Sequence, residues 1–286
     1  MEERIPKPDW IRVPIPHGDQ FKDMHNLLQE HGLNTVCTEA RCPNKAECWG
    51  CGTATFMVLG DICTRNCRFC AVGTAKNGQA VNNAEPQALA EAVRKLSLKY
   101  AVITSVDRDD LPDRGAGHFA ACILAVRKEA PDTKIEVLIP DYRGGELDEI
   151  IAARPDVIAH NIETVASLQN VRDQRASLEL SLLTLEETKA KSGIITKSSI
   201  MLGLGETEEE LFEAMDALRR VRCDILVLGQ YLQPGRQQLP VHRYVSPEEF
   251  ADYKKTAYAK GFSSVVAAPL ARTSYHARQS YPGNKE

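Results

Sequence analysis

Short, almost continuously apolar segments alternate with amphipathic segments along most of the chain. Apolar runs that are rich in β-branched residues are typical of parallel strands covered on both faces. We predict such strands over residues 53–59, 100–106, 134–139, 157–162, 197–203, 225–230 and 263–268. The spacing between most neighbouring strands is long enough for a helix.

Helix signals occupy the segments between these strands. In residues 86–99, Leu89, Val93 and Leu96 share one face, and Pro86 suits the first helical turn. Two later helices begin with a capping box, in which a Ser or Thr is followed three residues later by a Glu. These pairs are Thr207 with Glu210, before a helix to about residue 221, and Ser246 with Glu249, before a helix to Gly261.

Repeated strand–helix units imply a parallel sheet with right-handed crossovers. The pattern holds about six units and a late strand, too few for a closed eightfold barrel, so we expect an α/β fold with a partial (β/α)6 barrel. A doubly wound open sheet is the alternative, and both place the active site at the C-terminal ends of the strands. We expect one barrel domain over residues 53–262, with an N-terminal extension (1–52) and a C-terminal extension (263–286).

Composition and charge restrict the class of partner. The formal net charge of −4 argues against binding to nucleic acid or to anionic membranes. No apolar run approaches the roughly 20 residues that a membrane span requires. The first twenty residues carry Glu2, Glu3, Asp9 and four prolines, resemble neither a signal nor a transit peptide, and are expected to be extended. We therefore expect a cytoplasmic protein without nucleic-acid or membrane partners.

The nine cysteines are unevenly distributed along the chain. Seven of them fall between Cys37 and Cys70, and only Cys122 and Cys223 lie elsewhere. In a reducing compartment, such crowding indicates metal ligation rather than disulfides. Cys122 and Cys223 are expected to be small buried hydrophobic residues.

Three cysteines, Cys63, Cys67 and Cys70, follow the first predicted strand on one short loop. Thiolates suit iron–sulfur clusters or zinc. A zinc site would require a fourth Cys or His, usually in a second pair, and no such pair follows Cys70. We therefore expect a cubane cluster with three cysteine ligands and one open iron.

This spacing, with Phe69 directly before the last cysteine, resembles the signature of the radical S-adenosylmethionine (SAM) superfamily. There the open iron chelates SAM, and a glycine-containing strand end packs against its adenine, for which Gly203 is the candidate. Gly203 also has a simpler interpretation, as a turn residue. The polar residues Asn161 and Glu163, in turn, could simply cap a loop. The full set of expected cofactor-binding residues is Phe69, Ser105, Asp107, Asn161, Glu163, Arg175 and Gly203.

A second group of three cysteines lies upstream, at Cys37, Cys42 and Cys48. Their spacing is too irregular for one face of a helix, so we expect a loop. Three thiolates again lack an obvious fourth ligand. A second cluster here would take that ligand from elsewhere in the chain, or leave an iron open.

These two cysteine groups in succession resemble the lipoyl synthase family, and the resemblance extends over nearly the whole chain. The matching stretches are residues 7–10, 39–44, 47–49, 52–57, 104–111, 160–164, 197–207, 230–234 and 272–277. The resemblance implies that Ser274 is the fourth ligand of the upstream, auxiliary cluster. Departures from the family pattern are Thr273 for serine, Ala267-Ala268 for serine–glycine, Leu178 for tyrosine, Arg114 for glycine and the additional Cys51.

The resemblance also implies the activity. It predicts two [4Fe-4S] clusters, SAM cleavage at Cys63, Cys67 and Cys70, and insertion of two sulfur atoms from the auxiliary cluster into an octanoyl-lysine. The implied partners are an octanoylated lipoyl carrier domain (a dehydrogenase E2 subunit or glycine-cleavage H protein), an electron donor such as ferredoxin or flavodoxin, and cluster-repair proteins. Alternatives are another radical SAM sulfur-inserting enzyme, or a non-catalytic iron–sulfur or zinc module.

Overall fold

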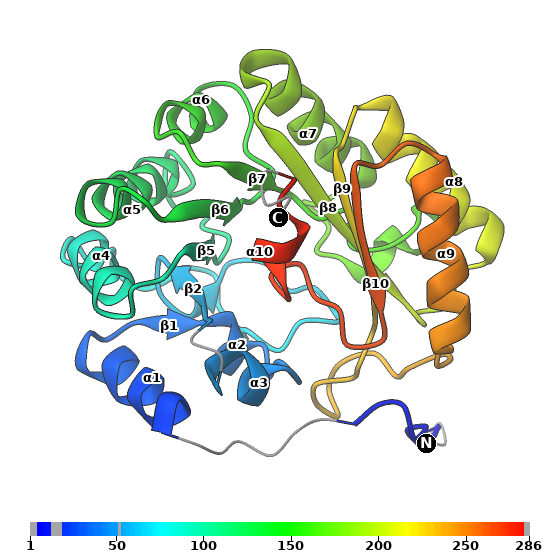
Figure 1. Ribbon diagram of the computed structural model, residues 1–286. Helices are drawn as coiled ribbons and strands as arrows, with labels where there is room; N and C mark the ends of the chain where they lie inside the picture. Colours follow the sequence, from blue (N-terminus) through cyan, green and yellow to red (C-terminus); the bar gives the residue numbers. More distant parts are fainter. Residues whose placement is uncertain (1–4, 13–18, 51–52, 283–286) are drawn as a thin grey trace. The chain divides into compact units, whose positions relative to one another are not determined.

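The computed structural model describes residues 5–12, 19–50 and 53–282, and these form an α/β protein with mostly parallel strand pairing (Figure 1). The chain divides into two compact units. The N-terminal unit contains described residues from 19–66 and 71–158, and the C-terminal unit contains residues 5–12, 67–70 and 159–282. The last point at which the chain passes from one unit to the other lies within strand β7 (Val157–Ala159).

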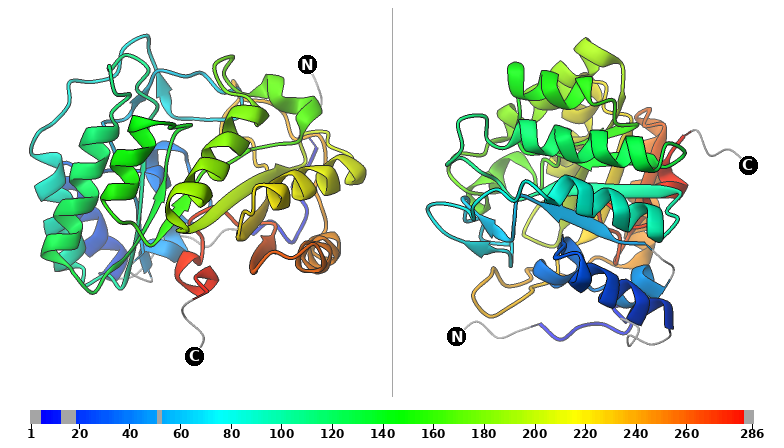
Figure 2. Two further views of the ribbon diagram at one scale, coloured as in Figure 1. Left: turned by 90° about the horizontal axis from the view of Figure 1, so that it is seen from above. Right: turned by 90° about the vertical axis from the view of Figure 1, so that its left-hand side faces the viewer.

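Parallel strands backed by helices make up the N-terminal unit. β2 (Thr55–Val58), β5 (Tyr100–Ser105) and β6 (Lys134–Leu138) pair in parallel in sequence order, and β1 (Asn34–Thr35) pairs antiparallel with β2. Helices α4, α5 and α6 pack in a row beside these strands (Figure 2). The remaining elements are α1 (Asp19–Glu30), α2 (Val36–Glu39), α3 (Lys45–Gly50), β3 (Ile62–Cys63), β4 (Gly73–Thr74), α4 (Glu85–Lys95), α5 (Ala116–Glu129) and α6 (Gly145–Ala152).

The C-terminal unit repeats the same arrangement. β8 (Ile195–Leu202), β9 (Ile225–Gln230) and β10 (Ser264–Ala268) pair in parallel, again in sequence order. Its core is formed by apolar side chains from these strands and from α8 and α9, among them Leu202, Met215 and Leu228. The helices are the 3-10 helix η1 (Ala166–Val171), α7 (Leu178–Ser192), α8 (Glu208–Arg220), α9 (Pro247–Ala259) and α10 (Ala277–Ser280).

Most predicted elements are present. All seven predicted strands occur, and both capping boxes form at the starts of α8 and α9. Residues 5–12 of the N-terminal arm contain no helix or strand, but α1, which was not predicted, begins at Asp19. The division into a barrel and two extensions remains a prediction. In the described part of the chain, no helix is both long and apolar enough to cross a membrane.

Candidate active site

The downstream cysteine segment (residues 63–70) begins at Cys63, the last residue of the short strand β3, which follows β2 in the chain. Because β2 and β5 are neighbouring parallel strands, the loops after them lie side by side, and the Thr64 N–H donates to the carbonyl of Asp107 (3.0 Å). The Sγ of Cys63 accepts the main-chain N–H of Arg65 (3.4 Å) and lies 3.8 Å from Oδ2 of Asp107. An N–H donated to sulfur favours the thiolate form that a metal ligand needs.

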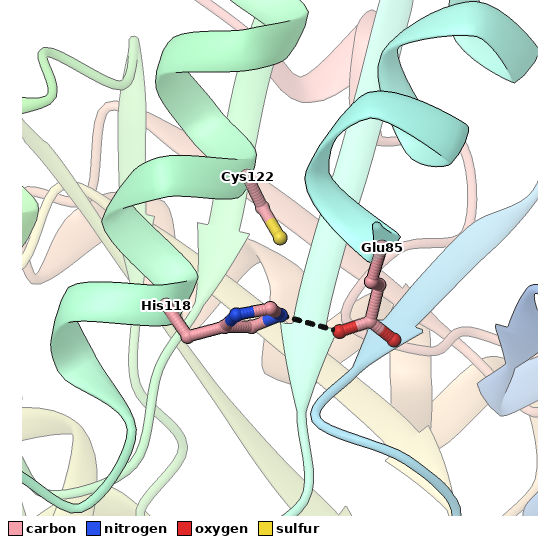
Figure 3. A group of neighbouring side chains, drawn as sticks. All are labelled: Glu85, His118 and Cys122. Atoms are coloured by element: carbon pink, nitrogen blue, oxygen red, sulfur yellow. Dashed lines mark hydrogen bonds and ion pairs between the residues drawn. The ribbon is translucent and has the colours of Figure 1, made fainter. Parts of the chain in front are cut away.

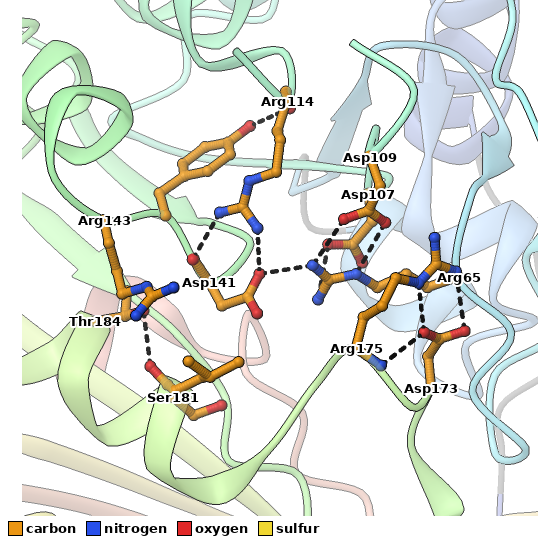
Figure 4. A network of polar contacts seen from close by, with 12 residues as sticks. Arg65, Asp107, Asp109, Arg114, Asp141, Arg143, Asp173, Arg175, Ser181 and Thr184 are labelled. Carbon is orange, nitrogen blue, oxygen red and sulfur yellow. Dashed lines mark hydrogen bonds and ion pairs between the residues drawn. The ribbon is translucent and has the colours of Figure 1, made fainter. Parts of the chain in front are cut away.

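Arg65 joins three carboxylates at the C-terminal ends of β5 and β6 (Figure 4). Its guanidinium donates two hydrogen bonds to Asp109 (3.0 and 2.9 Å) and one to Asp141 (2.8 Å), and it lies 3.4 Å from Asp107. The side chains of Arg65 and Asp141 are only 6% and 3% exposed, so neither charge is well solvated. Desolvation raises the pKa of Asp107 to about 6, an effect that Arg65 opposes. The start of the cysteine segment is thus fixed by buried ion pairs.

Arg114 extends this network from the loop before α5. Its φ is 50°, a left-handed conformation that glycine adopts more easily than arginine, which agrees with the glycine that the resemblance leads us to expect here. The Arg114 guanidinium donates two hydrogen bonds to Glu146 (3.0 and 2.9 Å) and one to Asp141 (2.9 Å). These ion pairs offset the strain of the left-handed conformation.

The rest of the downstream cysteine segment, residues 67–70, belongs to the C-terminal unit. The N–H of Arg68 donates to Val171 (2.8 Å), and its carbonyl accepts the N–H of Leu239 (3.1 Å). The Sγ of Cys67 accepts the main-chain N–H of Asp173 (3.3 Å). The carboxylate of Asp173 in turn accepts two hydrogen bonds from the exposed Arg175 guanidinium (2.7 and 3.1 Å). Arg175 therefore lies beside the residue whose N–H contacts Cys67.

Asn161 and Glu163 follow β7 and take different positions. The Asn161 side chain exchanges hydrogen bonds with the Thr273 hydroxyl (3.1 and 3.3 Å), so it lies beside the segment that carries Ser274. Glu163 has a φ of 66° and continues the ladder to β8, since the N–H of Met201 donates to its carbonyl (2.8 Å). The structure therefore joins Asn161 to the expected auxiliary ligand segment and gives Glu163 a main-chain role.

Gly203 lies directly after β8 in a turn closed by Glu206. The N–H groups of Gly203, Leu204 and Gly205 all donate to the Glu206 carboxylate (2.6, 2.9 and 3.1 Å). A side chain at position 203 would collide with Gln230 and with the Arg243 carbonyl, and the φ of 92° also requires glycine. This geometry explains a glycine in the turn, and contact of Gly203 with the adenine of SAM remains a prediction.

The upstream cysteine segment (residues 37–48) forms two short helices joined by a turn, so the expectation of a loop is wrong for Cys37 and Cys48 but holds for Cys42. Cys37 is buried in α2, Cys48 lies in α3, and Cys42 lies in the turn between them, where its N–H donates to the Cys37 carbonyl (3.2 Å). Lys45 connects the two helices: its Nζ bonds Thr38 (3.0 Å) and lies 4.3 Å from the centre of the Trp49 ring. The additional Cys51 lies outside the described residues.

Ser274 lies in the turn between β10 and α10. Its carbonyl accepts the N–H of Ala277 (3.3 Å), and the turn is closed by a bond from the Tyr275 N–H to Arg272 (2.9 Å). The departures at Ala267 and Ala268 fall inside β10, where both residues pair in register with β9. The backbone at Ala267 and Ala268 is therefore regular, and turn and coil occupy residues 269–273 ahead of Ser274.

Sequence reasoning did not assign a role to Asp109, Asp141 or Glu146. Asp109 and Asp141 come shortly after the apolar strand segments 100–106 and 134–139. Charged residues at the C-terminal ends of parallel strands are the available signal for such a network. Their pairing with Arg65 was not visible, because the partners lie 44 and 76 residues from it in sequence.

Comparisons with known proteins identify the family. A model of the radical SAM superfamily matches residues 57–218, and a model of the N-terminal domain of lipoyl synthase matches residues 1–42. Lipoyl synthase of Methanocella arvoryzae is 49% identical over 280 residues, covering 96% of this chain and 95% of that protein. Lipoyl synthase of Methylococcus capsulatus is 53% identical over 277 residues, covering 96% and 86%. The chain belongs to the lipoyl synthase family.

The fold agrees with this membership. Methylornithine synthase has a TM-score of 0.60 at 13% identity, over 87% of this chain and 76% of that one, which is a likeness of fold alone. Family membership makes this chain a radical SAM enzyme of the sulfur-inserting kind, and it implies iron–sulfur clusters and SAM as cofactors. The predicted family and α/β fold class are thereby confirmed.

The residues present suit these cofactors. Thiolates are the donors that iron–sulfur clusters require, and Cys63 and Cys67 each accept a main-chain N–H of the kind that tunes such clusters. The Oγ of Ser105, at the C-terminal end of β5, is buried and has no hydrogen-bond partner among the described residues. A buried hydroxyl without a partner is costly, so this group suits a polar ligand such as SAM.

Proposed function

We propose that this protein makes the lipoyl group by inserting sulfur at carbons 6 and 8 of an octanoyl-lysine on a carrier protein. Cys63, Cys67 and Cys70 would hold the [4Fe-4S] cluster that binds SAM. Cys37, Cys42, Cys48 and Ser274 would hold an auxiliary [4Fe-4S] cluster. The observation that carries the proposal is the presence of two cysteine triplets, each on its own structured segment, within a chain of the lipoyl synthase family.

The cofactors supply the difficult chemistry, and the protein binds and orients them. When bound, the downstream cluster supplies the electron that cleaves SAM, and the auxiliary cluster supplies the sulfur. The N–H groups of Arg65 and Asp173 would stabilise the thiolates of Cys63 and Cys67. The Ser105 hydroxyl would form a hydrogen bond with SAM, since its Oγ is buried without another partner among the described residues.

Ser274 is proposed as the labile ligand. An alkoxide is a harder donor than a thiolate and a poorer match to iron in a sulfide cluster. Of the four proposed ligands, Ser274 would therefore be the one that the auxiliary cluster holds most weakly. The contact between Asn161 and Thr273 would hold in place the turn that carries Ser274.

The partners follow from the reaction. A lipoyl synthase needs a carrier protein with the octanoyl chain and a source of electrons. We propose an octanoylated E2 subunit or H protein as the carrier, ferredoxin or flavodoxin as the reductant, and cluster-repair proteins that rebuild the auxiliary cluster. Cytoplasmic location remains a prediction.

The test is anaerobic reconstitution followed by assay on an octanoylated carrier peptide. Wild-type protein should hold about eight irons per chain, as two [4Fe-4S] clusters require, and should form 5′-deoxyadenosine together with the sulfur-containing peptide. Ser274→Ala should still cleave SAM but lose lipoyl product. Ser280→Ala, which changes a serine in the same C-terminal segment, is the matched control. Full lipoyl product from Ser274→Ala without added sulfide would overturn the role of this serine.

A further inference from the structure

The loop that leads to Cys63 begins with a strained residue. Leu59 directly follows β2 and has a φ of 69°, although it is not a glycine, and Gly60 continues the left-handed turn with a φ of 88°. Leu59 is 2% exposed, so its backbone groups are shielded from water. A residue other than glycine, asparagine or aspartate keeps this backbone conformation only when its surroundings fix it.

Two side chains bind the backbone N–H and carbonyl of Leu59. Its N–H donates to Oε2 of Glu85 (2.9 Å), and its carbonyl accepts a hydrogen bond from Arg108 (3.3 Å). Its side chain packs against Gly115, where an added Cβ would collide with it. The left-handed turn is therefore determined by α4, by the loop after β5 and by the start of α5.

Glu85 is itself oriented by a second residue (Figure 3). Its Oε2 lies 2.7 Å from Nε2 of His118 on α5, and the His118 and Glu85 side chains are 11% and 7% exposed. Cys122, one helical turn after His118, points toward the same pair. Its Sγ lies within 4.8 Å of a ring nitrogen of His118 and of a carboxylate oxygen of Glu85. Burial raises the pKa of the Cys122 thiol, so without a metal it stays neutral beside the carboxylate.

These contacts have a consequence for the cluster. Leu59 lies four residues before Cys63, and the conformation at Leu59 and Gly60 sets the direction in which the chain leaves β2. Cys63 is placed by this turn at one end and by the contact of Thr64 with Asp107 at the other. A change in the turn would therefore displace the first cluster ligand while leaving the strand itself in place.

We propose that Glu85, oriented by His118, is a positioning residue for the downstream cluster: it holds Leu59 in the left-handed conformation that directs the chain to Cys63. The inference rests on the proposed function only in that Cys63 is a cluster ligand. Groups that orient metal ligands from outside the first coordination sphere typically affect metal affinity or activity about 10–100-fold. Loss of Glu85 should therefore weaken SAM binding without changing any group that touches SAM.

The experiment compares three variants of the reconstituted holoenzyme. Glu85→Ala removes the acceptor of the Leu59 N–H, whereas Glu85→Gln retains an acceptor oxygen of the same reach. Asp156→Ala is the matched control, because Asp156 also accepts a buried main-chain N–H, from Ile135 (2.9 Å), but at the opposite end of the strands. The readouts are the thermal midpoint and the SAM concentration that half-maximally shifts the EPR spectrum of the reduced downstream cluster.

We expect Glu85→Ala to raise this SAM concentration about tenfold or more, and Glu85→Gln to raise it less than about threefold. Asp156→Ala should lower the thermal midpoint with unchanged SAM dependence. If Glu85→Ala does not fold, His118→Ala provides the test, because it retains the Leu59 bond and should give an intermediate shift. Equal SAM dependence in folded Glu85→Ala and Asp156→Ala would overturn the proposal.

Zinc analysis tests the competing interpretation of the same side chains. Glu, His and Cys are all zinc ligands, so about one zinc per chain that disappears in Cys122→Ala would overturn the positioning role and make Glu85 a metal ligand. Absence of zinc from active holoenzyme supports it. Because the EPR shift needs no octanoyl substrate, a wild-type protein without lipoyl activity would overturn the proposed function but leave this measurement intact.

Discussion

The two cysteine segments are held by different kinds of interaction. The downstream segment is anchored by a buried cation, Arg65, which joins carboxylates from two separate loops, and by main-chain bonds to residues distant in sequence. The upstream segment is held locally. Its helices are joined by Lys45, and Trp49 packs on Phe21 of α1 with ring centres 5.1 Å apart.

This difference agrees with the roles proposed for the two clusters. A buried ion-pair network is costly to disrupt, because removal of one partner leaves the others charged and poorly solvated. Such an anchor suits a cluster that must keep one geometry through many turnovers. Short helices held by local contacts open at a lower free energy than a core strand. We expect the upstream segment to accommodate loss and replacement of its cluster more easily.

The largest expected effect separates the two segments by their chemistry. Cys67→Ala should reduce 5′-deoxyadenosine formation to background and abolish lipoyl product, because SAM cleavage would depend on this ligand. Cys42→Ala should abolish lipoyl product while SAM cleavage continues. Liquid chromatography of 5′-deoxyadenosine and the mass of the octanoyl peptide measure the two activities in one reaction.

Cys223→Ala is the control for this pair, since Cys223 is also a cysteine but is buried in the core of the C-terminal unit. It should retain both activities. Loss of SAM cleavage in Cys42→Ala, with the iron of the downstream cluster still present, would contradict the division of roles between the segments.

The second effect compares the two cations that support the segments. Arg65→Met leaves the partly buried Asp109 short of a cation and leaves buried Asp141 with Arg114 as its remaining cation, and it should lower the free energy of unfolding by about 3 kcal/mol. Lys45→Met removes one hydrogen bond and a contact with the Trp49 ring, together about 1–2 kcal/mol. Chemical denaturation of both variants measures the difference. Similar losses would show that the ion pairs at Arg65 contribute no more than a local contact.

Much of the fold was visible in the sequence, because continuous apolar runs mark buried parallel strands. Strand β9 has the predicted bounds, Ile225–Gln230. Strand β7 ends at Ala159, three residues earlier than predicted, although Ile162 remains buried and Glu163, with a φ of 66°, still forms an isolated bridge with Ile200. An apolar pattern records burial, and burial continues past the end of a strand.

The candidate site was predictable only in part. Cysteine spacing located both ligand groups, but the helices α2 and α3, of 4 and 6 residues, are too short to show a helical period. The partners of Arg65 come from loops far apart in sequence, and only the adjacency of β2, β5 and β6 brings them together. The contact between Glu85 and Leu59 likewise depends on a backbone conformation that no residue pattern signals.

The smallest expected effect tests whether the upstream segment depends on apolar packing. Trp49 is 1% exposed, and its indole N–H has no hydrogen-bond partner among the described residues, so Trp49→Phe loses volume rather than a hydrogen bond. We expect a loss of about 1–2 kcal/mol in unfolding free energy, with less iron retained at the auxiliary cluster and unchanged SAM cleavage. Tyr142→Phe is the control beside the downstream segment, where it removes a bond to the Arg114 carbonyl (2.9 Å). The contrary result would be full retention of iron in Trp49→Phe together with loss of auxiliary iron in Tyr142→Phe. That result would show that local apolar packing does not hold the upstream helices.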